Sequence, residues 1–380
     1  MTQTALPLHA QTPRLNALIT RQQTGARFAA LQASALPPSA CDQAQQTITQ
    51  WPQYEATPCY PLNGLAHNLG IAALDCKDEG PRFGLGSFKA LGGAYAVAQI
   101  ASKQGRHITV TCATEGNHGR SVAWGAQNAG LRCVIFLHEN VSASREQAIA
   151  QYGAEIIRVA GNYDDAVRQC TEVAQQNGWQ IVSDTSWEGY EEIPRQVMAG
   201  YSLIATEIAH ALSQAPTHVF LQAGVGGIAT AMLTCLSRAW PMQNICFVVV
   251  EPLSAACLQA SALEEGRLQA IKGPFNTLSA GLACGEPAMA VLDVLYEGIH
   301  GYLAIDDEWI KQAVRLLAKP VGNDAPIVAG VSGAAGLGGL LAALDHDELK
   351  TALGLNAQSR VLIINTENDT DPAVYQDIIA

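Results

Sequence analysis

Short apolar runs alternate with amphipathic segments along most of the chain from residue 107 onward. The apolar runs are rich in β-branched residues, which predicts buried strands, and the amphipathic segments between them end at glycine, which predicts helices. The first set of expected strands covers residues 107–114, 133–138, 155–160 and 180–185, and the expected helices between them cover 118–130, 143–152 and 164–177. Strands that alternate with helices of this length form right-handed βαβ units, so we expect a parallel sheet.

A second set of elements follows a long amphipathic segment at roughly 193–213. Its expected strands cover 217–224, 245–252 and 360–366, and a helix is expected at 226–240. Residues 1–56 read as irregular with weak helical stretches. We therefore predict two three-layer α/β/α domains, in which a small domain (98–205) is nested in a large one (1–97 and 206–380). The functional site is expected between them, at the carboxyl ends of strands.

Composition narrows the possible functions. The 380 residues are 48% hydrophobic and only 15% charged, and their formal net charge is −12. Such a surface repels phosphate backbones, so no nucleic-acid partner is expected. No apolar run reaches the ~18 residues of a membrane span, and the first residues lack the pattern of a secretion signal, so we expect a cytoplasmic protein. Ten scattered cysteines without a C-x-x-C pair favour reduced core thiols and no metal site.

Three glycine-rich turns carry candidate chemistry. The first, at 82–96, places Lys89 at the start of an alanine-rich helix. The positive end of the helix dipole and apolar neighbours disfavour the charged form of an amine. A neutral lysine is able to attack an aldehyde. The alternative for this segment alone is an exposed surface lysine.

The second turn, TEGNHGR at 114–120, lies between an expected strand and an expected helix. Asn117 and His118 would project from it beside Glu115, although an ordinary N-cap turn explains the same residues. The third turn, at 223–229, would offer backbone N–H groups to a phosphate. It has neither the G-x-G-x-x-G pattern nor a P-loop lysine, so a small phosphorylated cofactor is favoured over a nucleotide.

Together, the lysine, the asparagine turn and the glycine-rich cup fit pyridoxal 5′-phosphate (PLP). The chain resembles the fold-type II PLP enzymes, the threonine dehydratase and tryptophan synthase β group. Within that group it is most similar to the diaminopropionate ammonia-lyases. The resemblance runs from about Thr57 to Asp371, and its specific stretches are RFGLGSFKALGGAYAVAQ, TEGNHGRSVAWGAQ, NYDDAVR, DTSWEGY, PTHVFLQAGVG, AGLACGEP and NTENDTD.

The resemblance implies α,β-elimination of 2,3-diaminopropionate to pyruvate and ammonia by a homodimeric PLP-dependent lyase. It implies that Lys89 holds the cofactor as a Schiff base and then serves as the general base. Asp184 would hold the β-ammonium group of the substrate, and Glu115 would be a second base on the opposite face. The implied cofactor-binding residues are Lys89, Asn117 at the pyridine O3′, His118 at the site wall, Gly224, Val225, Gly226 and Gly227 at the phosphate, and Thr366 at the pyridine nitrogen. Tyr190 and Glu286 are further pocket candidates.

Three positions depart from the family pattern. Glu115 stands where the family has aspartate, which leaves use of the D-isomer open. Val331 stands where a glutamate is usual, which leaves the leaving group open. Asn365 replaces a serine before Thr366, so either residue could face the pyridine nitrogen, and Thr366 is favoured.

Other functions remain as alternatives. A serine/threonine or 3-hydroxyaspartate dehydratase would use the same cofactor with water as leaving group. A β-replacement transferase would want a TSGNTG-type motif, which we do not find, and a non-enzymatic sensor would not need the intact Lys89 region. A disulfide between Cys257 and Cys284 is a further alternative to free thiols.

Overall fold

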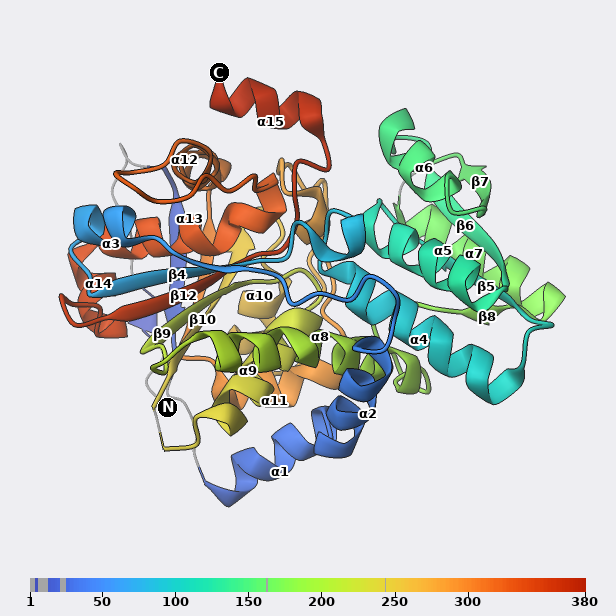
Figure 1. Ribbon diagram of the computed structural model, residues 1–380, viewed down its shortest axis with the longest axis horizontal. Helices are drawn as coiled ribbons and strands as arrows, with labels where there is room; N and C mark the ends of the chain where they lie inside the picture. The colour runs from blue at the N-terminus through green and yellow to red at the C-terminus, as the bar shows by residue number, and fades with distance from the viewer. Residues whose placement is uncertain (1–3, 6–12, 21–24, 162, 243) are drawn as a thin grey trace.

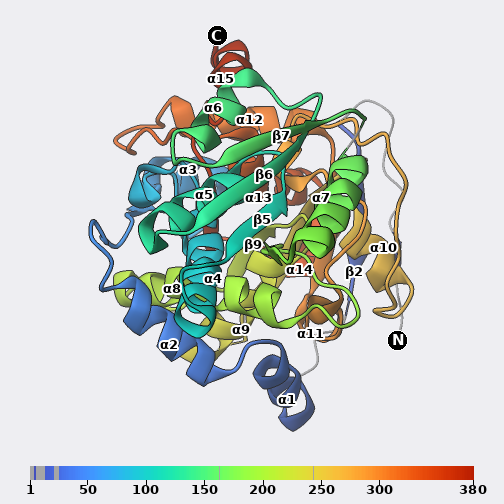
Figure 2. The same cartoon turned by 90° about the vertical axis from the view of Figure 1, so that its right-hand side faces the viewer.

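The computed structural model describes residues 4–5, 13–20, 25–161, 163–242 and 244–380. Two sheets, each flanked by helices, lie side by side along the long axis of the molecule (Figure 1). In the view turned by 90°, the smaller sheet lies between its helices (Figure 2). This arrangement confirms the expected α/β class.

The smaller sheet is parallel and contains β5 (Thr109–Ala113), β6 (Arg132–His138), β7 (Glu155–Val159) and β8 (Gln180–Ile181), in the order β7-β6-β5-β8. Its connections include α5 (Asn117–Ala129), α6 (Ala143–Ala150) and α7 (Tyr163–Asn177). The four strands predicted here are confirmed. The strand expected over 180–185 is shorter because the amide of Ser183 donates to the Tyr190 hydroxyl (2.9 Å) and not to a neighbouring strand.

The larger sheet has the order β1-β2-β11-β10-β9-β12-β4-β3. Its strands are β1 (Thr4–Ala5), β2 (Leu15–Ile19), β3 (Cys59–Pro61), β4 (Ala73–Asp78), β9 (His218–Gln222), β10 (Cys246–Pro252), β11 (Gly301–Ile305) and β12 (Arg360–Asn365). The central strands are parallel, and β1, β2 and β3 pair antiparallel at the two edges. Every residue of β9 and β10 is buried, as their continuous apolar runs predict.

Helices cover both sheets. They are α1 (Ala26–Ala35), α2 (Pro38–Ile48), α3 (Asn63–Leu69), α4 (Lys89–Gln104), α8 (Glu192–Ala211), α9 (Gly227–Ala239), α10 (Cys257–Leu263), α11 (Leu292–Gly298), α12 (Asp307–Ala318), α13 (Val331–Asp345), α14 (Asp347–Leu353) and α15 (Pro372–Ile379). Three 3₁₀ turns, at Arg82–Gly84, Ala280–Leu282 and Met289–Val291, complete the described elements. In the described part of the N-terminal segment, α1 and α2 agree with the expected helical stretches, whereas strand β2 was not predicted. Strand β2 is stabilised by antiparallel pairing with β11, a partner almost 300 residues away that no local pattern could indicate.

Helix α4 lies at the junction of the two units and packs closely on α5 and α8. A Cβ atom at Gly125 would come within 2.6 Å of the Ala94 Cα, and one at Gly200 within 2.3 Å of the Leu91 carbonyl oxygen. Glycine at these positions therefore allows the three backbones to approach. The domain boundaries predicted at 97/98 and 205/206 fall inside α4 and α8 and stay predictions.

Within the described ranges, no helix is both long enough and apolar enough to cross a bilayer. All ten cysteines have free thiols, so the alternative disulfide between Cys257 and Cys284 is not formed. The Cys257 thiol instead lies 3.7 Å from the Gly224 carbonyl oxygen. Among the residues described, no group of three or more His, Cys, Asp or Glu side chains could hold a metal ion.

Candidate active site

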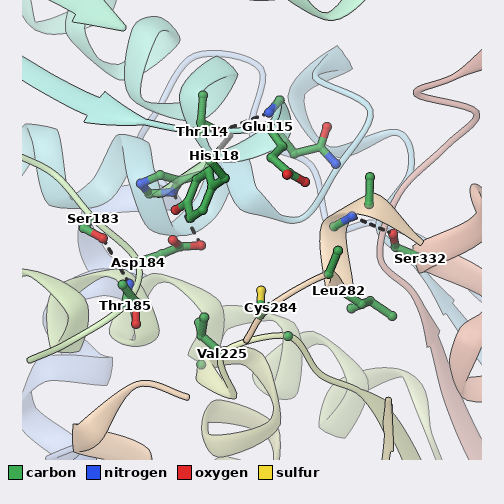
Figure 3. Close-up of a pocket in the computed structure, with 18 of the residues that line it drawn as sticks. Thr114, Glu115, His118, Ser183, Asp184, Thr185, Val225, Leu282, Cys284 and Ser332 are labelled. Atoms are coloured by element: carbon green, nitrogen blue, oxygen red, sulfur yellow. Dashed lines mark hydrogen bonds and ion pairs between the residues drawn. The ribbon is translucent and has the colours of Figure 1, made fainter. Parts of the chain in front are cut away.

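A cavity of about 1010 Å³ lies where the two units meet. Thr114, Glu115 and His118 approach it from the small unit, and Val225 and Cys284 lie across it on the large unit (Figure 3). The cavity brings together every residue predicted for catalysis or cofactor binding and one of the two further candidates, namely Lys89, Glu115, Asn117, His118, Asp184, Gly224, Val225, Gly226, Gly227, Thr366 and Glu286. These residues lie up to 277 positions apart, from Lys89 to Thr366, so their convergence is a property of the fold.

Lys89 is the first residue of α4, and its ammonium group forms an ion pair with the Asp184 carboxylate. Burial lowers the pKa of Lys89, but the negative charge of Asp184 outweighs burial, and the pKa is raised above its ordinary value. The predicted neutral amine is therefore wrong for this arrangement. The local sequence shows the helix start and its apolar neighbours, but not an aspartate brought in from 95 residues further on.

Asp184 also faces His118, whose Nδ1 lies 3.9 Å from the Asp184 Oδ2. Burial opposes ionisation of Asp184, yet the nearby His118 and Lys89 lower its pKa below the ordinary value. The pKa of His118 is lowered, chiefly by burial, and its Nε2 lies 2.8 Å from the Val182 carbonyl oxygen. That carbonyl can only accept, so Nε2 carries the proton, and Nδ1 is a buried atom without a hydrogen-bond partner among the described residues. Asp184 thus stays ionised beside a neutral imidazole.

Glu115 lies in the turn between β5 and α5, on the same side of the cavity as Thr114 and His118 (Figure 3). Burial raises its pKa to about 7, and Arg145 opposes this shift only in part. The Oε1 atom lies 3.5 Å from the Nε2 of His138, at the end of β6. A carboxyl group that titrates near neutral pH can both take up and release a proton under ordinary conditions.

Thr366 and Asn365, which follow one another at the end of β12, point to different places. The Thr366 hydroxyl lines the cavity and accepts a hydrogen bond from the Gln222 amide (3.0 Å). The Asn365 amide is buried and donates to Asp78 (2.8 Å) and to the Val328 carbonyl (3.1 Å). The alternation of side chains along a strand separates the two, and Thr366 is the one placed in the cavity.

The glycine-rich turn at 224–227 joins β9 to α9 and forms one wall of the cavity. Gly226, the N-cap of α9, has φ 97°, and a Cβ atom there would lie 2.8 Å from a Val291 methyl group. Only glycine fits this position without strain. The first amides of a helix have no acceptor within it, so this turn offers N–H groups to a phosphate. The cavity, the lysine and this turn together fit pyridoxal phosphate.

Two positions singled out in the sequence, Tyr190 and Val331, do not line the cavity. Tyr190 does not line the cavity; its hydroxyl donates to the Ile181 carbonyl (2.9 Å), and its ring stacks on Trp187. The prediction that Tyr190 lines the pocket is therefore wrong, because its hydroxyl is bonded to the backbone of Ile181 and Ser183. Val331 is buried at the start of α13 and lies outside the lining. The lining residues that the sequence reasoning missed include Tyr163, Gln222, Ser332 and Glu367.

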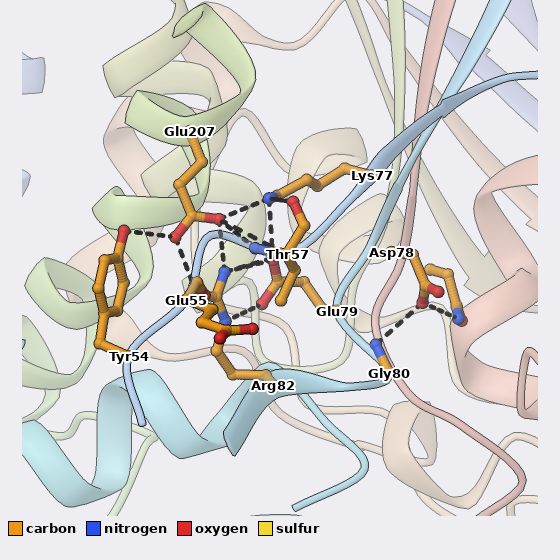
Figure 4. A network of polar contacts seen from close by, with 10 residues as sticks. Tyr54, Glu55, Thr57, Lys77, Asp78, Glu79, Gly80, Arg82 and Glu207 are labelled. Atoms are coloured by element: carbon orange, nitrogen blue, oxygen red, sulfur yellow. Dashed lines mark hydrogen bonds and ion pairs between the residues drawn. The ribbon is translucent and has the colours of Figure 1, made fainter. Parts of the chain in front are cut away.

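A cluster of buried charges supports the segment that carries Lys89 (Figure 4). Arg82 and Lys77 contact the carboxylates of Glu79 and Glu207, and the side chains of Lys77, Glu79 and Arg82 are at most 1% exposed. The guanidinium of Arg82 donates to both carboxylates at 2.7–2.9 Å. Glu207 belongs to α8, Lys77 to β4 and Arg82 to the 3₁₀ turn before α4. The cluster therefore holds the segment between β4 and α4 against α8.

A family model described as "Pyridoxal-phosphate dependent enzyme" matches residues 51–367. This match covers most of the chain and agrees with the fold and the cavity, so the chain belongs to the family of pyridoxal-phosphate dependent enzymes. It is similar to the diaminopropionate ammonia-lyase of Escherichia coli strain K12, with 39% identity over 86% of this chain and 87% of the relative. The diaminopropionate ammonia-lyase of Salmonella typhimurium is 37% identical over 86% of this chain and 89% of its own.

Solved structures agree. The holo crystal structure of the E. coli diaminopropionate ammonia-lyase superposes with a TM-score of 0.88 at 36% identity, and 97% of each chain is covered. A second crystal structure of that enzyme, in complex with an aminoacrylate-PLP azomethine reaction intermediate, has a TM-score of 0.87 at 36% identity over the same shares. The predicted resemblance to this group is confirmed.

Proposed function

We propose that this protein converts 2,3-diaminopropionate and water to pyruvate and two molecules of ammonia by PLP-dependent α,β-elimination. The observation that carries the proposal is the Asp184 carboxylate beside Lys89 in a cavity that also contains the glycine-rich turn. A substrate with two ammonium groups requires an anion near its β-carbon. The similarity to diaminopropionate ammonia-lyases over 86% of the chain supports the same substrate.

The residues present would hold the cofactor at three points. The amine of Lys89 would bind its aldehyde carbon, the amides of the 224–227 turn its phosphate, and the Thr366 hydroxyl its ring nitrogen. The Asn117 amide would contact its O3′ oxygen, and His118 would line the site. Once bound, PLP supplies an electron sink for the negative charge that develops at the substrate Cα.

Proton movement is the task of the protein side chains. After the substrate amine has displaced it, Lys89 is free to accept the Cα proton of an L-substrate. Glu115, which also lines the cavity and has a pKa of about 7, is the base we assign to the D-isomer. Asp184 stays ionised and holds the β-ammonium group of the substrate in its protonated form. The β-nitrogen can then leave as neutral ammonia, whereas an unprotonated amine would have to leave as an amide anion.

A panel of amino acids with pyruvate as readout tests the proposal. L- and D-2,3-diaminopropionate are compared with L- and D-serine, L-threonine and the 3-hydroxyaspartates. We expect pyruvate from L-diaminopropionate at a higher kcat/KM than from any hydroxy amino acid, and none from a Lys89→Ala variant. Absence of pyruvate from both diaminopropionate isomers would overturn the substrate assignment, and a hydroxy amino acid as the best substrate would favour a dehydratase.

We also propose that the protein is a cytoplasmic homodimer. The ten free thiols support a reducing compartment. Light scattering of the purified protein gives its mass in solution, and a monomer mass at micromolar concentration would overturn the homodimer. Fractionation of the native host tests the compartment.

A further inference from the structure

Glu367 follows Thr366 at the end of β12 and lies where the two units meet. Its side chain accepts hydrogen bonds from three donors: the Asn117 Nδ2 (2.6 Å), the Ser332 backbone amide (3.2 Å) and the Thr370 hydroxyl (3.3 Å). Asn117 belongs to the small unit, whereas Ser332 and Thr370 belong to the large one. The residue is 7% exposed, so water does not compete freely for these donors. The proposed function gives Glu367 no role.

The backbone of Glu367 is fixed as firmly as its side chain. Its carbonyl oxygen accepts from the Gly330 amide (2.9 Å), and it forms a β-bridge with Ser87, two residues before Lys89. A Cβ atom at Gly330 would lie 2.9 Å from the Glu367 Oε1, so the space beside the carboxylate is already filled. The carboxylate therefore has a defined place from which it can orient a neighbour.

The neighbour in need of orientation is the Asn117 carboxamide. The oxygen and the NH₂ group of an asparagine are nearly equal in size, so packing alone does not decide which of them faces the cavity. An ionised carboxylate can only accept hydrogen bonds, and it therefore selects the Nδ2 atom. The second hydrogen on Nδ2 is then the one that Asn117 can offer to a ligand. The bond to a charged acceptor also polarises that N–H.

We propose that Glu367 is a positioning residue that fixes the Asn117 amide so that its free N–H is directed at the O3′ oxygen of the bound cofactor. This inference rests on the proposed function, because it takes Asn117 as the residue that contacts O3′. Glu367 acts through Asn117 and touches no reacting atom.

The variant Glu367→Gln separates positioning from mere filling of space. A glutamine at this position keeps the shape but has one acceptor oxygen, whereas Asn117 and Ser332 each need an acceptor from a different side. If the glutamine oxygen faces Ser332, its NH₂ group meets the Asn117 NH₂ and the asparagine must reverse. The matched control is Thr370→Val, which removes one donor to the carboxylate and leaves the bond to Asn117 in place.

The test uses the holoenzyme and two readouts besides activity: the PLP dissociation constant, from titration of the apoprotein, and the ratio of the two absorbance bands of the lysine-bound cofactor, which reports hydrogen bonding at O3′. Loss of a charged hydrogen bond predicts PLP binding that is about tenfold weaker in Glu367→Gln, with an altered band ratio. Asn117→Ala is expected to give the same change. The double variant is expected to be no weaker than Asn117→Ala alone, because both act through one amide.

Wild-type affinity and band ratio in a folded Glu367→Gln variant would overturn the inference, and so would additive effects in the double variant or an equal loss in Thr370→Val. If Glu367→Gln does not fold, a crystal structure of the wild-type holoenzyme decides: an Asn117 amide more than 3.5 Å from Glu367 overturns it, and a retained bond supports it. Failure of the wild-type protein itself to bind PLP or to release pyruvate would instead overturn the proposed function.

Discussion

Replacement of Arg82 by methionine should cost a large part of the stability of the fold. Arg82 is 1% exposed, and its guanidinium makes four hydrogen bonds to the carboxylates of Glu79 and Glu207. Methionine fills most of the volume but leaves two buried carboxylates with the single cation of Lys77. Removal of one partner from a buried ion pair costs about 3–5 kcal/mol in the free energy of unfolding, and we expect a loss of this size at pH 8.

The pH dependence of this loss provides the sharper test. In the wild-type protein burial opposes ionisation of Glu79, but Arg82 holds its pKa below the ordinary value. Its stabilising contribution is therefore present above the unfolded pKa and is lost only as the pH falls through the folded one. Without Arg82, burial should raise the folded pKa of Glu79 above the unfolded one. Its contribution is then present at low pH and is lost as the pH rises, so the deficit of Arg82→Met should grow between pH 5 and pH 8.

The assay is urea unfolding of the wild-type and variant proteins, followed by far-ultraviolet circular dichroism at pH 5, 6.5 and 8. The control is Arg168→Met, because Arg168 is 65% exposed in its ion pair with Asp165 on the surface of α7. Exposed pairs contribute about 0.2–1 kcal/mol, and this loss should not grow with pH. An Arg82→Met deficit below about 1 kcal/mol, or one that is equal at pH 5 and pH 8, would refute the reasoning.

Three further predictions concern the cavity. The rate of elimination from D-diaminopropionate should rise as the pH passes about 7, where Glu115 loses its proton. The variant Glu115→Gln should abolish turnover of the D-isomer and keep turnover of the L-isomer. Full D-isomer turnover in this variant would contradict the assignment of Glu115 as the base. Asp184→Asn should lower kcat for L-diaminopropionate by about 10²–10³-fold, as expected for the loss of a fixed charge beside the reacting group. A kcat within a factor of three of wild type in steady-state kinetics would count against this role. Gly226→Ala forces alanine to φ 97°, at a cost of about 1–2 kcal/mol, and should weaken PLP binding about tenfold or more. The control is Gly130→Ala, at φ 69° after the C-terminal end of α5. This variant should lose stability but keep its affinity for PLP.

The sequence predicted the core of the fold because buried parallel strands leave a strong local record. The apolar runs that became β6, β9 and β10 are continuous, and the helices between strands end at residues such as Gly130 and Gly178, whose positive φ angles terminate them. Strand β2 shows no such local pattern, because it depends on pairing with β11, a strand almost 300 residues away in the chain.

The residues of the candidate site also divide into those that a local sequence pattern indicates and those that depend on distant parts of the chain. Turns between a strand and a helix can be recognised locally, and this is why Asn117, Lys89 and the 224–227 turn were predicted and lie together. Contacts between the units cannot be read in this way. The Asp184 carboxylate beside Lys89 reversed the expected direction of the lysine pKa, and Glu367 was missed because its only visible quality in sequence is an ordinary acidic side chain after a strand.

The position of β12 determines when during synthesis the large sheet can form. It lies between β9 and β4 in the sheet, yet it follows all the other described strands in the chain. While the ribosome is still translating the chain, β4 and β9 have no partner on their facing edges, whereas the smaller unit between them already has all four of its strands. The nested unit can therefore fold co-translationally, and the large sheet must wait until β12 has been made. Thr366 and Glu367 follow β12 directly, so a chain that stops short of them lacks both the central strand and that part of the cavity wall.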